Sequence, residues 1–272
     1  MTGAVLTSAV LHAGWNALAH RSPDPAAAVV LIHLGLAGIS LPLLPLVAPP
    51  LPAARPYLVA GLALHLVYTA LLARCYRIGE FNQVYPLARG TAPLLVAVVA
   101  VTVVGERMSA AALTGVAVVC GGLALLVWRG GPRSGPAVLA AAATGVCVAG
   151  YTVVDGLGVR LAGGAAGYTI WLLAVHGAAV SGFGAVRYRR ELGPVLRRSW
   201  WVAVVGGGAG WASYALVLGA QSRGALAAVA ALRETSVVVA AVLGAMLFGE
   251  RLGRRRVLAS VLVACGVVLL TL

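Results

Sequence analysis

The sequence has too few charged residues to build a water-soluble surface. It contains 20 basic and 7 acidic residues among 272, so that 10% are charged, whereas about a quarter are charged in soluble domains. Hydrophobic residues make up 61% of the chain, and the mean hydropathy is +0.98. These values exclude a water-soluble enzyme and indicate that most of the chain lies in a lipid bilayer.

Lysine is absent, and all 20 basic residues are arginine, which gives a formal net charge of +13. Such a charge on a soluble domain would indicate nucleic acid as a partner. Here nearly all the arginines lie between apolar runs, with few aromatic residues among them. The charge therefore indicates membrane topology, and no nucleic-acid partner is predicted.

Paired cysteines are also absent, because Cys75, Cys120, Cys147 and Cys265 stand alone in apolar surroundings. They are interpreted as small apolar residues of helix interiors. No two of the five histidines are four residues apart, and none has a carboxylate neighbour, as a helical zinc site would require. The sequence therefore predicts neither a metal nor a cofactor.

Long apolar runs, separated by charge, proline or glycine, account for almost the whole chain. Runs of about 20 residues are long enough to cross a bilayer as helices. We therefore expect an all-α integral membrane protein with ten transmembrane helices. The predicted helices are 3–20, 26–47, 57–75, 81–104, 109–128, 136–155, 165–186, 200–220, 224–248 and 255–272.

The chain contains an internal repeat. Residues 85–107 align with residues 229–251 at an offset of 144, which pairs Arg89 with Arg233 and matches two Gly-Glu-Arg segments. The alignment predicts one five-helix repeat over residues 1–131 and a second over 132–272. Because each repeat has an odd number of helices, the two enter the membrane in opposite orientations. Inverted repeats of this kind are typical of transporters, with the substrate site between them.

Three segments carry a resemblance to a known family: His12-Ala-Gly-Trp-Asn, Tyr85-Pro-Leu-Ala-Arg-Gly and Tyr151-Thr-Val-Val-Asp-Gly. With the five-plus-five repeat, the chain resembles the EamA-type transporters of the drug/metabolite transporter superfamily. This resemblance implies a secondary carrier of small metabolites, often an exporter, without specifying the substrate. The small multidrug relatives place a coupling glutamate in their first helix. The first helix here has none, so antiport of cationic drugs by that device is not expected.

Two arginines lie deep within predicted helices. Arg89 and Arg233 are eight and nine residues into helices that begin at opposite membrane faces, so both approach the middle of the bilayer. Glu234 follows directly as a possible counter-charge. The pair is interpreted as a clamp for a carboxylate or phosphoryl group. The alternative is an internal Arg–Glu pair that holds the two halves together.

Asp155 is the last residue of predicted helix 136–155, with Tyr151 one turn before it. The sequence leaves open whether Asp155 reaches a cavity, neutralises an arginine, caps the helix or binds a coupling proton. The segment Asp155–Arg160 is similar to the start of an intramembrane phosphotransferase motif. That chemistry needs further aspartates downstream, and no acidic residue follows before Glu191. The chain is therefore not predicted to be an enzyme.

Polar and aromatic side chains form stripes at helical spacing, namely His12, Trp15 and Asn16, then His65, Tyr68 and Thr69, then Trp211 and Tyr214. Such stripes suit the wall of a ligand cavity. Single members could equally make interhelical hydrogen bonds or lie at the headgroup level. The candidate substrate-binding residues are Arg89, Arg233, Glu234, Asp155, Trp15, Asn16, Tyr68, Tyr85, Tyr151, Tyr214, His12 and Trp211.

These observations predict a multi-pass carrier of the bacterial inner membrane that works by alternating access. Its expected substrate is a small anionic or zwitterionic metabolite such as an amino-acid-like compound. Its other partners are the lipid bilayer and a coupling ion, for which the proton is the candidate, and the carrier is a monomer or homodimer. Two alternatives remain: a flippase for a lipid-linked headgroup, or a structural or signalling membrane protein that moves no solute.

The distribution of arginine predicts an orientation. Fourteen arginines follow the odd-numbered predicted helices and four follow the even-numbered ones. The positive-inside rule places the larger group in the cytoplasm, and therefore both termini outside. The family resemblance implies the opposite, with both termini in the cytoplasm.

Overall fold

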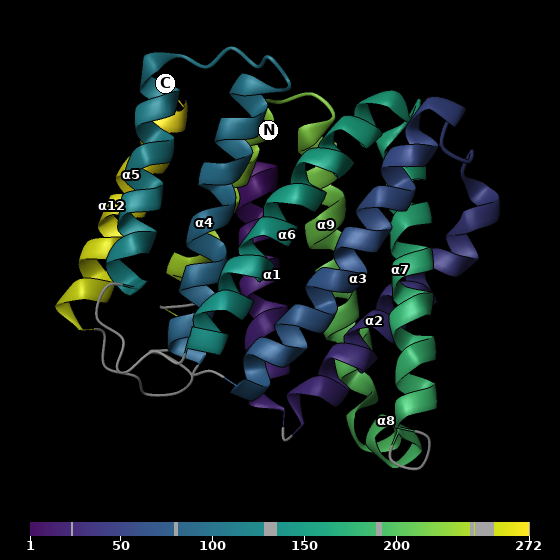
Figure 1. Ribbon diagram of the computed structural model, residues 1–272. Coiled ribbons are helices and arrows are strands. Elements are labelled where there is room, and N and C mark those ends of the chain that lie inside the picture. The colour runs from purple at the N-terminus through teal and green to yellow at the C-terminus, as the bar shows by residue number, and fades with distance from the viewer. Residues whose placement is uncertain are drawn as a thin grey trace.

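The protein is a bundle of helices (Figure 1). The computed structural model describes residues 1–22, 24–78, 81–127, 135–188, 192–239, 242 and 253–271. No strand occurs among them, which confirms the all-α prediction. The helices are α1 (Thr2–Arg21), α2 (Pro25–Leu43), α3 (Arg55–Ile78), α4 (Phe81–Thr102), α5 (Ala110–Val127), α6 (Gly135–Leu161), α7 (Ala165–Arg187), α8 (Leu192–Trp201), α9 (Gly207–Gln221), α10 (Leu226–Arg233) and α12 (Arg254–Thr271), with short turns η1 (Leu44–Leu46) and η2 (Pro52–Ala54) and a π-helical segment η3 (Val202–Gly206).

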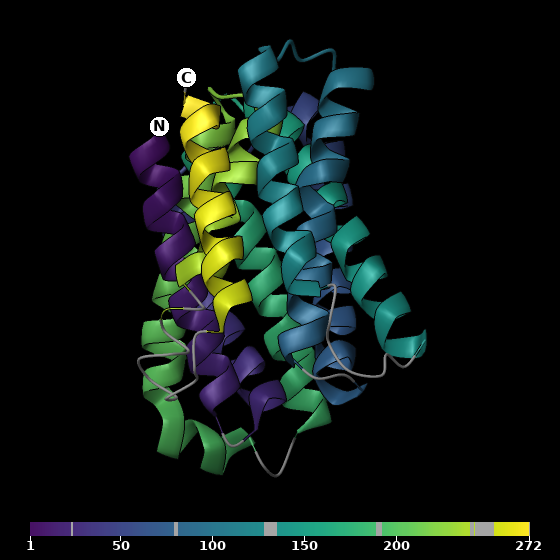
Figure 2. The same cartoon turned by 90° about the vertical axis from the view of Figure 1, so that its left-hand side faces the viewer.

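Five described helical stretches are long and apolar enough to cross a bilayer: Pro25–Leu46, Pro52–Leu72, Val138–Leu161, Ala165–Arg187 and Gly193–Gln221. Shorter apolar helical stretches cover 92–102, 110–125 and 257–270. The protein is therefore a multi-pass membrane protein, whereas the full set of ten spans remains a prediction. Figures 1 and 2 show the start of α1 and the end of α12 at the same end of the bundle, as an even number of spans requires.

Helix α2 illustrates how local sequence sets the boundaries. The side chain of Asp24 accepts hydrogen bonds from the backbone N–H groups of Ala26 (2.9 Å) and Ala27 (3.1 Å). Pro25 occupies the first helical position, where the missing N–H has no helical partner to lose. Aspartate followed by proline is therefore a strong start signal for this span.

Three boundaries differ from the sequence prediction. Helix α6 continues to Leu161, so that Asp155 lies inside the helix, because its carboxylate is buried and hydrogen-bonded by other helices. The predicted helix 200–220 begins earlier, with α8, and contains the π-helical segment η3. The predicted helix 224–248 is interrupted at Glu234, which lies in a turn after α10. There the hydroxyl of Thr235 donates to the carbonyl of Leu232 (2.8 Å).

The main helix contacts join segments far apart in the sequence. Helix α2 packs on α7, α5 on α12, α3 on α6, and α1 on α9, while α4 contacts both α6 and α10. Several of these contacts are close because glycine removes the side chain between two backbones. A Cβ atom on Gly207 of α9 would lie 2.6 Å from the Cα of Gly35 in α2, and one on Gly177 of α7 would lie 2.7 Å from the backbone nitrogen of Ala37.

The end of the bundle that carries the termini is cross-linked by an ion pair. Arg160, at the end of α6, donates to Glu106 over 2.8 Å and to the carbonyl groups of Gln221 (3.0 Å) and Gly224 (2.7 Å). The carboxylate of Glu106 also accepts the backbone N–H of Leu226, the first residue of α10, at 2.9 Å. Glu106 therefore caps a helix that lies 120 residues further along the chain.

Candidate functional site

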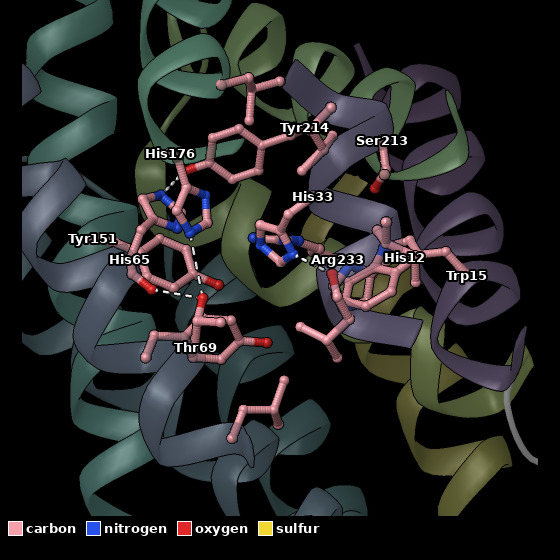
Figure 3. Close-up of a pocket in the computed structure, with 17 residues that line it drawn as sticks. His12, Trp15, His33, His65, Thr69, Tyr151, His176, Ser213, Tyr214 and Arg233 are labelled. Atoms are coloured by element: carbon pink, nitrogen blue, oxygen red, sulfur yellow. Dashed lines mark hydrogen bonds between the residues drawn. The ribbon is translucent and has the colours of Figure 1, made fainter. Parts of the chain in front are cut away.

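A cavity lies within the bundle, between α1, α2, α3, α6, α7, α9 and α10 (Figure 3). Its wall is mainly aromatic and aliphatic, with polar groups at a few positions. The aromatic and polar lining residues are His12, Trp15, His33, His65, Tyr68, Thr69, Tyr151, His176, Ser213, Tyr214 and Arg233.

Arg233 is the one arginine among the described residues that line this cavity. It is the last residue of α10 and only 5% of its surface is exposed. Its guanidinium carbon lies 5.7 Å from the centre of the Tyr214 ring, a distance at which the ring face attracts a cation. The Nε atom of Arg233 makes no hydrogen bond within the described part of the chain.

Asp155 lies behind the cavity wall and is completely buried. One carboxylate oxygen, Oδ2, accepts from Nε2 of His65 at 2.8 Å and from the hydroxyl of Tyr214 at 2.5 Å. The other oxygen, Oδ1, accepts from the hydroxyl of Tyr168 at 3.0 Å. The four side chains come from α3, α6, α7 and α9, so that this polar cluster joins four helices.

Gly61 on α3 makes this approach possible. A Cβ atom at position 61 would collide with Oδ1 of Asp155. Because glycine has no side chain, the carboxylate can lie directly against the backbone of α3, one turn before His65. The packing of α3 on α6 and the hydrogen bonds of Asp155 are therefore established together.

Three histidines form a row along the cavity wall. The ring of His65 stacks on Tyr151, with centroids 4.1 Å apart, and lies 5.1 Å from the ring of His176. His33 lies edge-on to His176 at 4.7 Å. Nδ1 of His33 is 2.7 Å from the carbonyl of Val29, which can only accept, so this nitrogen carries hydrogen.

The structure brings together six of the residues that the sequence singles out. The residues that line the cavity are His12, Trp15, Tyr68, Tyr151, Tyr214 and Arg233. Figure 3 shows that they converge from opposite sides, with Trp15 and His12 facing Tyr151 across the pocket. The helical stripes on α1, α3 and α9 each contribute at least one side chain to this cavity wall.

Four other candidates lie away from the lining surface. The amide of Asn16 donates to the carbonyl of His12 in its own helix (2.8 Å), and the indole N–H of Trp211 donates to Ser40 (3.0 Å). Glu234 is buried, with 2% of its surface exposed, but does not line the cavity. Asp155 neither ends a helix nor bonds an arginine, because His65, Tyr168 and Tyr214 take up its oxygens.

The last two candidates, Tyr85 and Arg89, belong to α4. Their side chains are outside the described part of the structure. The predicted pairing of Arg89 with Arg233 therefore remains a prediction. Helix α4 does contact α10, the helix that carries Arg233.

The sequence candidates omitted three histidines that belong to the site: His33, His65 and His176. His65 shares a helical stripe with Tyr68 and Thr69, and this spacing is the feature of the sequence that could have placed it in the site. His33 and His176 are single ionisable residues inside otherwise apolar helices. In a membrane span, such a residue is itself a sign of function.

Comparison with known proteins agrees with this fold. The chain belongs to the EamA-like transporter family, which matches residues 135–272. No curated protein sequence matches the chain. Among solved structures 28 chains match, and one, described only as "Crystal structure of protein", aligns over 100% of this chain and 98% of its own with a TM-score of 0.77. Its sequence identity is 20%, so this likeness shows the fold alone.

Proposed function

We propose that the protein is a secondary carrier that moves a small anionic or zwitterionic metabolite by alternating access, with Arg233 binding the acidic group. Membership of the EamA-like transporter family supports transport in general. The observation that carries the choice of substrate is a buried guanidinium on the wall of an intramembrane cavity. Because a charge inside the bilayer costs several kcal/mol, such a residue is retained for a purpose.

The surroundings of Arg233 support an anion site. Asp155 shares Tyr214 with Arg233, but its oxygens are already bonded by His65, Tyr168 and Tyr214. Arg233 also presents an Nε–H without a hydrogen-bond partner in the described part of the chain. A carboxylate or phosphoryl group in the cavity can accept from this N–H and from the terminal nitrogens together, as a planar guanidinium favours.

The remaining wall suits the body of a metabolite, including one with an amine. Trp15, Tyr68 and Tyr151 line the cavity with aromatic surface, which binds apolar groups and attracts cations. An amine therefore finds its partners among these rings. Asp155 does not provide them, because it lies behind His65 and Tyr214.

The helix packing supports the two inverted repeats, residues 1–131 and 132–272, on which alternating access depends. In the two repeats, α1 corresponds to α6, α2 to α7, α3 to the helix formed by η3 and α9, and α5 to α12. The contact of α3 with α6 therefore corresponds to the contact of the η3–α9 helix with α1, and both contacts are present. The α2–α7 and α5–α12 contacts each join two corresponding helices. Helices α1 and α6, the first of each half, run in opposite directions through the bundle (Figure 1). In this proposal the carrier resides in the bacterial inner membrane.

The proposal is tested by uptake into vesicles that contain the purified protein. The panel should include labelled amino acids, dicarboxylates and sugar phosphates, with lipophilic cations for comparison. We expect uptake only of compounds with an acidic group, and loss of that uptake in Arg233→Gln and Arg233→Lys. Arg223→Gln is the matched control, because Arg223 is exposed at the end of the bundle.

Two results would contradict the anion site. One is uptake of the cations alone. The other is a folded Arg233→Gln variant that transports its substrate at the unmodified rate. Folding is checked by the melting temperature of each purified variant. The same assay also detects binding, because a ligand at 100 times its Kd adds about 2.7 kcal/mol to the free energy of unfolding.

A further inference from the structure

We propose that His65 and Asp155 form the proton-binding site that couples this carrier to a proton gradient, with the proton arriving from the cavity at Nδ1 of His65. The proposal rests on the carrier function inferred above. It assigns a role to the polar cluster behind the cavity wall, which anion binding at Arg233 leaves unexplained. The ligand of this site is the proton itself.

The first argument is the environment of the carboxylate. Asp155 is fully buried in the middle of α6, and three donors surround it, none of them from an arginine. Hydrogen bonds reduce the cost of burying an ionised carboxylate, but a full opposite charge reduces it further. Among the three donors, His65 is the only base, so it is the side chain that can gain a positive charge by taking up a proton.

The second argument is the tautomer of His65. Nε2 is 2.8 Å from Oδ2 of Asp155, and an ionised carboxylate can only accept, so the hydrogen of the neutral ring is on Nε2. Nδ1 then carries the lone pair. Within the described residues Nδ1 makes no hydrogen bond, and His65 lines the cavity. A proton from cavity water adds to Nδ1, and the neutral ring and carboxylate become an imidazolium–carboxylate pair.

The charge balance of this step is simple. One hydronium ion gives up a proton and becomes water, one N–H bond forms on His65, and the net charge of the His65–Asp155 pair rises from −1 to 0. Among the described residues, the titratable and charged groups near the pair lie on several of the helices that pack around it. They are Tyr151 on α6, Tyr168 and His176 on α7, Tyr214 on α9, Arg233 on α10 and, beyond His176, His33 on α2.

The third argument is the link to the anion site. Tyr214 bonds Asp155 through its hydroxyl and meets Arg233 at its ring face, so the two sites share one side chain. A proton on His65 adds positive charge close to Arg233, which strengthens the binding of an anion there. By thermodynamic reciprocity the bound anion favours the proton by the same factor. This linkage predicts that proton and anion bind together.

The test measures protonation of His65 directly and needs no substrate. Protein labelled with 15N-histidine is placed in phospholipid nanodiscs, and its ring nitrogens are followed by NMR between pH 5 and 9, with His65→Gln assigning the signal. We expect His65 to have hydrogen on Nε2 at high pH and to become doubly protonated at low pH. Asp155→Asn should lower the pH of this change by about one unit or more, because a negative partner is lost.

Arg233→Gln supplies a second variant that leaves the polar cluster itself intact. It should move the same change to higher pH, because a nearby positive charge is removed. Arg223→Gln is the matched control, because it also removes an arginine and Arg223 is exposed at the end of the bundle. It should leave the signal of His65 unchanged.

A His65 ring that keeps one protonation state over the whole range would overturn the proposal. So would a titration that is unaffected by both Asp155→Asn and Arg233→Gln. Vesicle uptake separates this failure from failure of the carrier function. Uptake that responds to an imposed pH gradient only while His65 is present supports coupling, and uptake indifferent to the gradient overturns it. If His65 titrates as expected but no compound of the panel is taken up, the proton site stands and the carrier function is wrong.

Discussion

The ring of Tyr214 lies between Arg233 and Asp155. Its centre is 5.7 Å from the guanidinium carbon, and its hydroxyl donates to the carboxylate over 2.5 Å. This one side chain therefore connects the cavity wall to the buried polar cluster, and its hydroxyl and its ring have separable roles.

Tyr214→Phe tests that separation. The variant keeps the ring beneath Arg233 and removes one donor to Asp155, so we expect anion binding to persist while uptake loses most of its response to a pH gradient. Stability should fall by about 1–3 kcal/mol, because a buried acceptor loses a partner. Tyr57→Phe is the control, because it also removes one phenolic hydroxyl, from a tyrosine of α3 that neither lines the cavity nor bonds Asp155. An unchanged pH response in Tyr214→Phe would contradict the assigned role of the hydroxyl.

Gly61→Ala should disrupt the polar cluster from the side of α3. The added methyl group would collide with Oδ1 of Asp155, so α3 and α6 must separate or the carboxylate must move. We expect a loss of about 1–3 kcal/mol in stability, which is the usual cost of overpacking, and slower uptake. Gly38→Ala is the matched control, because no atom lies within 4 Å of a Cβ at position 38. Equal melting temperatures for the two variants would show that the contact is unimportant.

Glu106→Ala should loosen the start of α10. The variant removes the acceptor for the backbone N–H of Leu226 and the ion pair with Arg160. Loss of a helix cap typically costs about 0.5–2 kcal/mol, and the melting temperature in detergent measures it. Arg107→Ala, at the exposed neighbouring position, should be neutral. The prediction fails if Glu106→Ala melts at the same temperature as Arg107→Ala.

The charge distribution predicts that both termini face away from the cytoplasm. Arg21 and Arg187 end α1 and α7, and Arg254 begins α12, all at the end of the bundle opposite the termini. A reporter that is active only in the cytoplasm, fused after Leu272, should therefore give little signal. The same reporter inserted between α7 and α8 should give a strong one. The reverse pattern would favour the orientation that the family resemblance implies.

The sequence predicts the helices well because each is an apolar run with polar ends, and that information is local. It also predicts that Arg233 is buried, since the residue lies well inside an apolar run. The role of Asp155 could not be predicted in this way. Its partners His65 and Tyr214 are 90 and 59 residues away, and only the packing of α6 on α3 and α9 brings them together.

The same reasoning explains two specific differences. The sequence places the end of a helix at Asp155 because charge bounds the apolar run there, but hydrogen bonds from three donors allow the buried carboxylate to lie inside α6. His33 and His176 were not selected because a single histidine in an apolar run creates no periodic pattern. Their proximity, with ring centroids 4.7 Å apart, arises from the contact of α2 with α7.

The glycines that border α2 restrict how the bundle can move. Gly207 of α9 contacts this helix backbone to backbone on one side, and Gly177 of α7 does so on the other. Helices that touch through their backbones can turn about the point of contact, but they cannot separate without losing this close packing. Helix α2 is thus a pivot that is held at two points of backbone contact. Any motion that opens the cavity while keeping these two contacts must displace the other helices around it, α1, α3, α6 and α10.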